Sequence, residues 1–477
     1  MIPEPCTITV DLESNEVKFP QNNTVKCKNG HLFLVGKPYF RSEACLLPST
    51  VFYDGSKTLV EKLNACKLIS EIIDVLNDMI GDWAVIYYRE DFKKVLLGRD
   101  VFGRKSLLWK RIDKTFYFSI FACDQQRSWY GVPSGTVTVL DLCSEENVIF
   151  YAFEVKGPWI EQFNKLRRVQ REVSREDLAA IMLKQLKEAV YRTISNLDNF
   201  VKCISLSFSG GVDSLLIAHL LAHCMPQNVV FDLVNVAFDA GKKYDGAPDR
   251  PQSKEAFKYL KSCYPDLSLR LILVNVDLDE LAHCRKRYIS SAVAPACSVL
   301  DDSIGCVQWF AARGEGFLFE DEERPLVPRK SEARTVFVGS GADELFGGYM
   351  RHRTTYLKKG RNAVVDELRE EMKRIGERNL GRDDRVVSSL GKDLKSPFLD
   401  DLFVEWVTSL SLECKTDFTQ SRGIGEKWLI REALKLLGTP QTLYLTPKRA
   451  MQFGTRIAKL ENRKEKGNDV CPRLLEK

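Results

Sequence analysis

The chain has 477 residues, of which 44% are hydrophobic and 28% charged. These values exclude a mainly disordered protein, and the length predicts two or three domains. Its 70 basic and 65 acidic residues give a net charge of only +5, so charge provides no reason to expect a nucleic-acid partner. No apolar run approaches the roughly 18 residues that span a bilayer, and the opening residues lack a secretory signal. We therefore expect a cytoplasmic protein with no membrane partner, whose 14 cysteines are thiols.

Residues 1–160 are predicted to form mostly β-strands. Apolar runs rich in β-branched and aromatic residues alternate with turn-forming residues. Near 56–66 the spacing of apolar residues predicts an amphipathic helix, and a second can follow it at 70–80. The predicted strands lie at 31–36, 83–88, 94–100, 116–122 and 136–142.

The pattern changes after this first, strand-rich domain. Residues 161–199 are expected to be a linker and a helix. From 200 to 460, apolar strands alternate with helices, which implies right-handed crossovers and a parallel sheet. A further buried strand is expected at 335–341. The charge-rich segment 461–477 is expected to be a flexible tail.

The sharpest motif is Ser-Gly-Gly-Val-Asp-Ser at 209–214, where an apolar strand ends and a helix begins. Gly210 and Gly211 allow a tight turn whose free N–H groups face outward at a helix N-terminus, which makes an anion site. Hydroxyls at both ends of the string can bond a phosphate, and Asp213 is placed to hold Mg²⁺ against a pyrophosphate. No Walker A sequence is present. An ordinary glycine-rich turn is the alternative, but the full string favours nucleotide binding.

A second motif, Gly-Ser-Gly-Ala-Asp-Glu-Leu-Phe-Gly-Gly-Tyr at 339–349, also follows a predicted strand. Asp343 adds a second carboxylate for Mg²⁺, and the glycines let the backbone approach an adenylate. A solvated acidic turn is the alternative interpretation. The first motif resembles the PP-loop ATP pyrophosphatases, which split ATP between the α and β phosphates and adenylate a substrate. The second is similar to the corresponding element of the asparagine synthetases.

Other strings resemble the asparagine synthetase family in the same order, and the resemblance covers roughly 200–460. By position, Arg313 and Lys427 match the family's cationic residues that neutralise pyrophosphate, and Val236 matches a position whose backbone meets adenine. Solvated charges and simple core packing are the plain alternatives for these three. The family usually has an acidic residue where this chain has Ser340, so the resemblance implies slow amination. The matching strings are 299–305, 378–400, 422–433 and 447–460.

The resemblance thus implies a set of site residues. The residues expected to contact ATP are Phe208, Ser209, Gly210, Gly211, Asp213, Ser214, Val236, Gly339 and Ser340. Asp213 and Asp343 are expected to bind Mg²⁺. The residues expected to take part in catalysis are Arg313, Lys427 and Glu344.

The first 160 residues resemble the class II glutamine amidotransferase fold, most clearly at 98–108. In that family the nucleophile is a cysteine directly after the initiator methionine. Here that position is Ile2, and Cys6 has no neighbouring chemistry that would activate it. Val35 stands where an oxyanion-stabilising amide is expected. The resemblance therefore implies an inactive amidotransferase domain.

The resulting fold class is α/β: a reduced antiparallel α/β/β/α sandwich over 1–160, then a parallel-sheet PP-loop domain over 200–460 with a helical C-terminal part. The implied function is ATP-dependent amidation of aspartate through a β-aspartyl-AMP, with ammonia rather than glutamine as nitrogen donor. Two alternatives remain open. One is an inactive ATP-binding scaffold or interaction protein, and the other is adenylation of a different acceptor.

Overall fold

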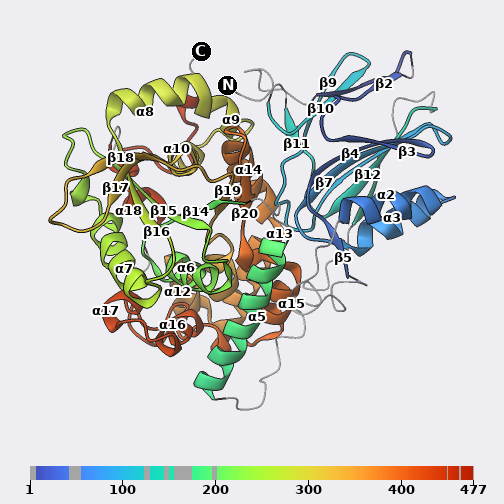
Figure 1. The fold of residues 1–477 in the computed structure, drawn as a ribbon. Helices are drawn as coiled ribbons and strands as arrows, with labels where there is room; N and C mark the ends of the chain where they lie inside the picture. The colour runs from blue at the N-terminus through green and yellow to red at the C-terminus, as the bar shows by residue number, and fades with distance from the viewer. Residues whose placement is uncertain are drawn as a thin grey trace.

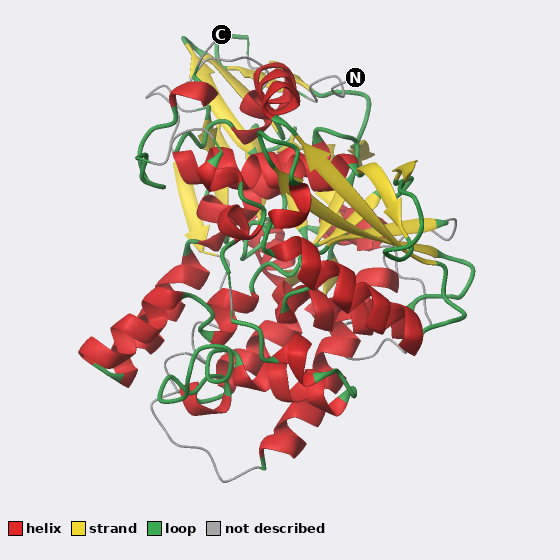
Figure 2. Cartoon of the chain, turned by 90° about the vertical axis from the view of Figure 1, so that its left-hand side faces the viewer, coloured by secondary structure: helices red, strands yellow, loops and turns green. Residues whose placement is uncertain are grey.

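The structure is a computed structural model that describes residues 7–14, 16–41, 55–122, 129–143, 150–154, 174–195, 201–447, 449–460 and 464–475. The N-terminal strands lie to one side of a larger unit of strands and helices (Figure 1). In the view of Figure 2 the helices fill most of the lower half and the strands gather above them. No helix in the described ranges is both long and apolar enough to cross a membrane.

Two antiparallel sheets stack face to face in the N-terminal part. One has the strand order β11-β9-β10-β1-β2 and the other β13-β12-β8-β7-β4-β3, while β5 and β6 pair separately. The bounds are β1 Ile8–Asp11, β2 Glu16–Lys18, β3 Thr24–Cys27, β4 Gly30–Gly36, β5 Tyr39–Phe40, β6 Met79–Ile80, β7 Trp83–Arg89, β8 Lys94–Arg99, β9 Leu108–Ile112, β10 Thr115–Ser119, β11 Tyr130–Gly131, β12 Thr136–Asp141 and β13 Phe150–Glu154.

The alternation of side chains in β7 explains the layering. Ala84 and Ile86 point towards the sheet that contains β1 and β10, whereas Val85 and Tyr87 pack under α2 (Gly55–Ala65) and α3 (Ile69–Asp78). The described part of residues 7–154 therefore forms three layers, α/β/β. The second helical layer of the expected α/β/β/α sandwich is not found in these ranges.

The second half is built on a seven-stranded sheet of order β18-β17-β16-β15-β14-β19-β20. Five strands are parallel, as predicted, but β17 and β18 form an antiparallel hairpin at one edge, so the sheet is mixed rather than wholly parallel. Gly316 lets β17 pair closely with β16, because a Cβ there would lie 2.3 Å from the carbonyl oxygen of Leu273 in β16. The bounds are β14 Cys203–Ser207, β15 Val230–Phe238, β16 Leu269–Val276, β17 Glu315–Phe319, β18 Val327–Lys330, β19 Thr335–Phe337 and β20 Asp393–Lys395.

Helices cover both faces of this sheet. Leu233 points into one core with α6, α7 and α16, and the adjacent Val234 points into the other with α10 and α9. The helices are α5 Arg175–Ser195, α6 Val212–Cys224, α7 Asp249–Cys263, α8 Leu278–Cys284, α9 Ser290–Val293, α10 Val299–Arg313, α11 Ala342–Phe346, α12 Met350–Lys359, α13 Arg361–Lys373, α14 Gly381–Ser388, α15 Asp401–Ser409, α16 Trp428–Leu436, α17 Gln441–Tyr444 and α18 Met451–Gly454. Short 3₁₀ or π turns are η1 Tyr244–Gly246, η2 Arg285–Ile289, η3 Gly376–Leu380, η4 Pro397–Leu399, η5 Leu412–Cys414, η6 Ile457–Lys459 and η7 Pro472–Leu474.

The segment expected to be a flexible tail is docked where it is described. The N–H of Val299 donates to the carbonyl oxygen of Asp469 over 2.8 Å. The backbone N–H of Cys471, a fully buried residue, donates to the carbonyl oxygen of Cys297 over 2.8 Å. Arg473 forms an ion pair with Glu465 at 2.8 Å. The expectation failed because charge-rich composition does not reveal that these backbone groups complete the start of α10.

Buried ion pairs join the two halves. Arg104 donates to Asp401 over 2.8 Å and to the carbonyl oxygen of Leu399 over 2.7 Å. Lys105 lies 3.2 Å from Asp384 and 2.5 Å from Asp393. Since a buried charge without its partner costs several kcal/mol, these pairs fix how the halves dock.

We predict that Arg104→Ala lowers the free energy of unfolding by about 3–5 kcal/mol, because it leaves Asp100 and Asp401 buried without their shared cation. Urea denaturation measures this change. Arg324→Ala is the control, since its ion pair with Glu320 is exposed and should contribute far less to stability. Equal effects of the two substitutions would contradict the assignment.

Stability should also depend on His219 in α6. Burial lowers the pKa of this imidazole to about 4, against about 6.5 in the unfolded chain. The unfolded state therefore takes up the proton first, and stability present above pH 6.5 is lost as the pH falls towards 4, by up to about 3 kcal/mol. Urea denaturation from pH 4.5 to 7 should show a shallower pH dependence for His219→Gln. The same substitution at the exposed His283 should leave the slope unchanged.

Candidate functional site

The first motif forms the turn between β14 and α6, as predicted. Gly210 has φ +75°, and a Cβ there would lie 2.7 Å from the carbonyl oxygen of Gln252. The side-chain amide of Gln252 donates to the carbonyl oxygen of Gly210 over 2.9 Å. Only glycine fits this left-handed, closely packed position.

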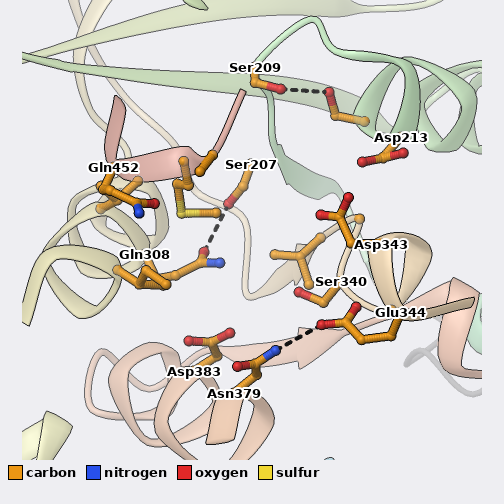
Figure 3. A pocket seen from close by; sticks show the side chains of 18 of the residues that line it. Ser207, Ser209, Asp213, Gln308, Ser340, Asp343, Glu344, Asn379, Asp383 and Gln452 are labelled. Carbon is orange, nitrogen blue, oxygen red and sulfur yellow. Dashed lines mark hydrogen bonds between the residues drawn. The ribbon is translucent and has the colours of Figure 1, made fainter. Parts of the chain in front are cut away.

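Hydroxyl groups hold the turn in shape. Ser209 Oγ accepts from the N–H of Gly211 over 3.2 Å and lies 3.3 Å from Ser214 Oγ (Figure 3). Ser214 Oγ donates to the carbonyl oxygen of Gly211 over 3.1 Å. Both serines line the cavity described below, where their hydroxyls can also reach a ligand.

The second motif lies beside the first because their strands are neighbours. β14 pairs in parallel with β19, so the loops that follow both strands leave the sheet at the same edge. A Cβ on Gly339 would lie 3.1 Å from the Cβ of Asp213, so this glycine lets the two loops approach closely. Asp343 then enters the site from the first turn of α11.

Lys427 joins the two motifs. Its Nζ lies 2.6 Å from Asp213 Oδ2 and 2.6 Å from Asp343 Oδ1, and its side chain is 0% exposed. A Cβ on Gly348 would lie 2.0 Å from Asp343 Oδ1 and 2.1 Å from Lys427 Cε, so glycine leaves room for the pair. The lysine expected to neutralise pyrophosphate thus contacts both carboxylates expected to hold Mg²⁺. Two carboxylates that share one ammonium leave a net charge of −1 and oxygen atoms suited to a divalent cation.

The structure does not bring Arg313 to these residues. It ends α10, where Nη2 lies 2.5 Å from Glu280 and the guanidinium stacks over Trp309 and Phe310. Arg313 matches the family's cation by position, but in the structure it belongs to a different ion pair. It is not among the residues that line the cavity described below.

A cavity of about 640 Å³ opens in front of the two motifs (Figure 3). Among the predicted site residues, those that line it are Phe208, Ser209, Asp213, Ser214, Val236, Gly339, Ser340, Asp343 and Glu344; Gly210 and Gly211 shape the turn without lining it, and the buried Lys427 contacts Asp213 and Asp343 without lining it.

Glu344 is held by two donors. Tyr349 Oη donates to its Oε1 over 2.7 Å, and Asn379 Nδ2 donates to the same atom over 3.1 Å. Burial raises the pKa of Glu344, and the negative charge of Asp343 adds to this effect. A buried carboxylate with a raised pKa is suited to carrying a proton during a reaction.

Several polar residues of the cavity were not predicted. Gln308, Asn379, Asp383 and Gln452 line it from α10, η3, α14 and α18 (Figure 3). Asn379, Asp383 and Gln452 lie within the strings 378–400 and 447–460 that resemble the family, but that resemblance assigned no role to them, and Gln308 lies outside the matching strings. The signal that could have found them was thus the match of these strings, together with the doubled acid of Arg-Asp-Asp-Arg at 382–385.

A cluster at the cavity rim resembles a metal site in composition. His352, Glu367 and Glu371 place ligand atoms within 4.8 Å of one another. However, His352 Nδ1 accepts from the N–H of Tyr349, so Nε2 carries the proton and donates to Glu371 over 2.9 Å. Arg351 also pairs with both glutamates. We interpret the cluster as a network of ion pairs.

We predict that Gly348→Ala lowers the free energy of unfolding by more than about 2 kcal/mol, since the new methyl group forces Lys427 and Asp343 apart inside a buried site. Urea denaturation is the measurement. Gly131→Ala is the matched control, because no atom lies within 4 Å of its added Cβ. An equally small change for both variants would mean that the ion pair tolerates displacement.

Comparison with known proteins identifies the family. Residues 357–466 match the asparagine synthase family. The chain is 32% identical to asparagine synthetase domain-containing protein 1 of Mus musculus, over 88% of this chain and 85% of that protein. It is 29% identical to asparagine synthetase domain-containing protein YML096W of Saccharomyces cerevisiae, over 82% and 73%.

Two further similarities are weaker. The chain is 27% identical to a putative glutamine-hydrolyzing asparagine synthetase of Methanocaldococcus jannaschii, over 74% of this chain and 60% of that protein. The likeness to the solved structure of an allosteric regulatory enzyme of purine biosynthesis covers 56% of this chain and 64% of that one, with 10% identity and a TM-score of 0.23, which is too low to support a conclusion. The resemblance found in the sequence is thus confirmed at the level of the family, and the chain belongs to the asparagine synthetase domain-containing proteins.

Proposed function

We propose that residues 200–460 form a PP-loop synthetase domain that uses Mg-ATP to activate the side-chain carboxylate of aspartate and then amidates it with ammonia. The observation that carries this proposal is the buried contact of Lys427 with Asp213 and Asp343. It brings one cation and two carboxylates together where two glycine-rich loops meet at one edge of the sheet.

ATP is proposed to lie between the first motif and Val236, with its phosphates towards Asp213. Mg²⁺, held by Asp213 and Asp343, would offset the charge of the departing pyrophosphate. Lys427 contributes a further positive charge at the same place. Ser209 and Ser214 supply hydroxyl groups, and the turn between them leaves backbone N–H groups at the start of α6.

The proposed reaction has two steps. An oxygen of the aspartate β-carboxylate attacks the α-phosphorus, and the bond from that phosphorus to the bridging oxygen breaks as pyrophosphate leaves. Ammonia then attacks the activated carbonyl carbon, the bond to AMP breaks, and the nitrogen loses a proton. Glu344, whose pKa is raised by burial, is proposed to take this proton as a substitute for the acidic residue that the asparagine synthetases usually have where this chain has Ser340.

Ammonia rather than glutamine is proposed as nitrogen donor. Val35 lies in β4, opposite Ala84, and its side chain packs in an apolar cluster, where it offers no hydrogen bond to an oxyanion. Ile2 and Cys6 lie outside the described residues. On this proposal residues 1–160 form an amidotransferase-like domain without glutaminase activity.

One observation favours the alternative, an ATP-binding scaffold without catalysis. Arg313 pairs with Glu280, whereas Lys427 pairs with Asp213 and Asp343, so one expected cation lies outside the proposed pyrophosphate site. Exchange of labelled pyrophosphate into ATP decides between the two proposals. Exchange that depends on aspartate supports the synthetase, and ATP binding without such exchange supports the scaffold.

We predict that Asp213→Asn weakens Mg-ATP binding by at least about 10-fold and binding of metal-free ATP far less, because it removes a charged metal ligand. Isothermal titration calorimetry with and without Mg²⁺ provides both values. Asp245→Asn, at an exposed carboxylate, is the control. Equal Mg-ATP affinity of Asp213→Asn and the wild type would remove Asp213 from the metal site.

We also predict that amination is slower than adenylation in the wild type, because the Ser340 hydroxyl is a poor base and a lost general base typically costs about 10²–10⁴-fold. Aspartate-dependent exchange should therefore exceed asparagine formation from ammonium. Ser340→Glu should narrow this gap, whereas Ser340→Ala should not. Asparagine formation that keeps pace with exchange in the wild type would show that Ser340 is no handicap.

A further inference from the structure

A buried carboxylate that no motif predicted lies at the end of the cavity away from Ser209 and Asp213. Asp383, in α14, is 3% exposed and lines the cavity. In Figure 3 it lies beside Asn379, across the cavity from the first motif. The reaction as proposed above assigns no role to it.

The charge of Asp383 is only partly compensated. Its Oδ1 accepts from Arg382 over 2.9 Å, and no hydrogen bond or ion pair found among the described residues reaches its Oδ2. Arg382 is shared, because its Nη1 also donates to Asp301 over 2.7 Å. Two carboxylates thus depend on one guanidinium, and a carboxylate that borders the cavity has an oxygen available to a ligand. Burial raises the pKa of Asp383, and this effect exceeds the lowering by the positive charge of Arg382.

A neighbouring amide extends this acceptor surface. Asn379 and Asp383 are four residues apart on adjoining helical turns, which places them on the same face. Asn379 Nδ2 donates to Glu344, and this orientation leaves its Oδ1 as an acceptor. A group with several N–H donors and a positive charge is the complement of one carboxylate oxygen and one amide oxygen.

Resting on the proposed function, we infer that Asp383 recognises the protonated amino group of the acceptor substrate. The acceptor is therefore an amino acid, and a dicarboxylic acid without an amino group is rejected. The ammonium binds Asp383 Oδ2 with Asn379 as second acceptor. Since Asn379 also contacts Glu344, the same wall orients the substrate and holds the proposed proton carrier.

A purely structural role is the competing explanation. In that case Asp383 would only balance Arg382, as Asp301 does. Asp301 makes this explanation testable, because it pairs with the same guanidinium but does not line the cavity. Asp301→Asn and Asp383→Asn each remove one carboxylate from Arg382, and only the second removes a charge from the cavity wall.

The first measurement uses the wild-type full chain. With Mg²⁺ and α,β-methylene-ATP, whose α–β bridge resists cleavage, isothermal titration calorimetry compares aspartate with succinate, which is aspartate without the amino group. We expect aspartate to bind at least about 10-fold more tightly, since a hydrogen-bonded charge contributes roughly this factor. Equal affinities, or no binding of either acid, would overturn the inference.

The second measurement uses the variants. Asp383→Asn should reduce the preference for aspartate to below about 3-fold by weakening aspartate binding, with succinate binding unchanged or stronger. Asp383→Glu should recover part of the preference, and Asp301→Asn should keep it. Equal loss of preference in Asp301→Asn and Asp383→Asn would mean that the effect passes through Arg382, and would overturn direct recognition.

The titration of α,β-methylene-ATP alone separates this inference from the function on which it rests. Nucleotide binding that is unchanged in Asp383→Asn shows that the variant is folded. If the nucleotide binds and the amino group makes no difference, the inference fails and the synthetase proposal stands. If the wild type does not bind Mg-nucleotide, the synthetase proposal fails, and the comparison of the two acids without nucleotide still tests Asp383.

Discussion

The ammonium group of Lys427 between Asp213 and Asp343 is the interaction on which the site depends. A fully buried lysine is stable only where carboxylates compensate its charge. Here each carboxylate comes from the first turn of a different helix, α6 or α11, and the loops that lead to these helices leave neighbouring parallel strands at the same edge of the sheet. The ion pairs therefore hold the two motifs and the start of α16 together as one unit.

The segment 376–401 connects this site to the N-terminal half. Asn379 and Asp383 line the cavity, while Asp384 and Asp401 receive Lys105 and Arg104 from the other half. Consecutive acidic residues thus face in different directions, one towards the cavity and the next towards the interface. Lys105 therefore contacts α14, which carries Asp383, and Arg104 contacts the first residue of α15, so the N-terminal half holds the segment that lines one side of the cavity.

Sequence predicted what is local. The strand, glycine turn and helix at 203–224 follow from apolar periodicity and from Gly210, whose φ of +75° other residues rarely adopt. The contact of Lys427 with Asp213 joins residues 214 positions apart, and periodicity does not report such pairing. The sequence analysis also missed the hairpin of β17 and β18. These two short strands flank a charged segment, and no strand pattern of alternating apolar residues marks them.

The two cationic residues assigned by resemblance show the limit of position alone. Lys427 and Arg313 matched equally well in sequence, but only Lys427 reaches the motif carboxylates, while Arg313 is held by Glu280. Asp383 shows the converse case, because it lies in the matching string 378–400 without an assigned role, and only the fold shows that it lines the cavity. The sequence alone therefore did not predict which side chains of distant helices reach the cavity.

The most direct test of the account is a crystal structure of the chain with Mg²⁺ and α,β-methylene-ATP. The account predicts a metal ion bound by Asp213 and Asp343, phosphates at the turn from Ser209 to Ser214, and Lys427 Nζ in contact with a phosphate oxygen. Nucleotide bound elsewhere, or Lys427 still paired with both carboxylates and no metal between them, would contradict it.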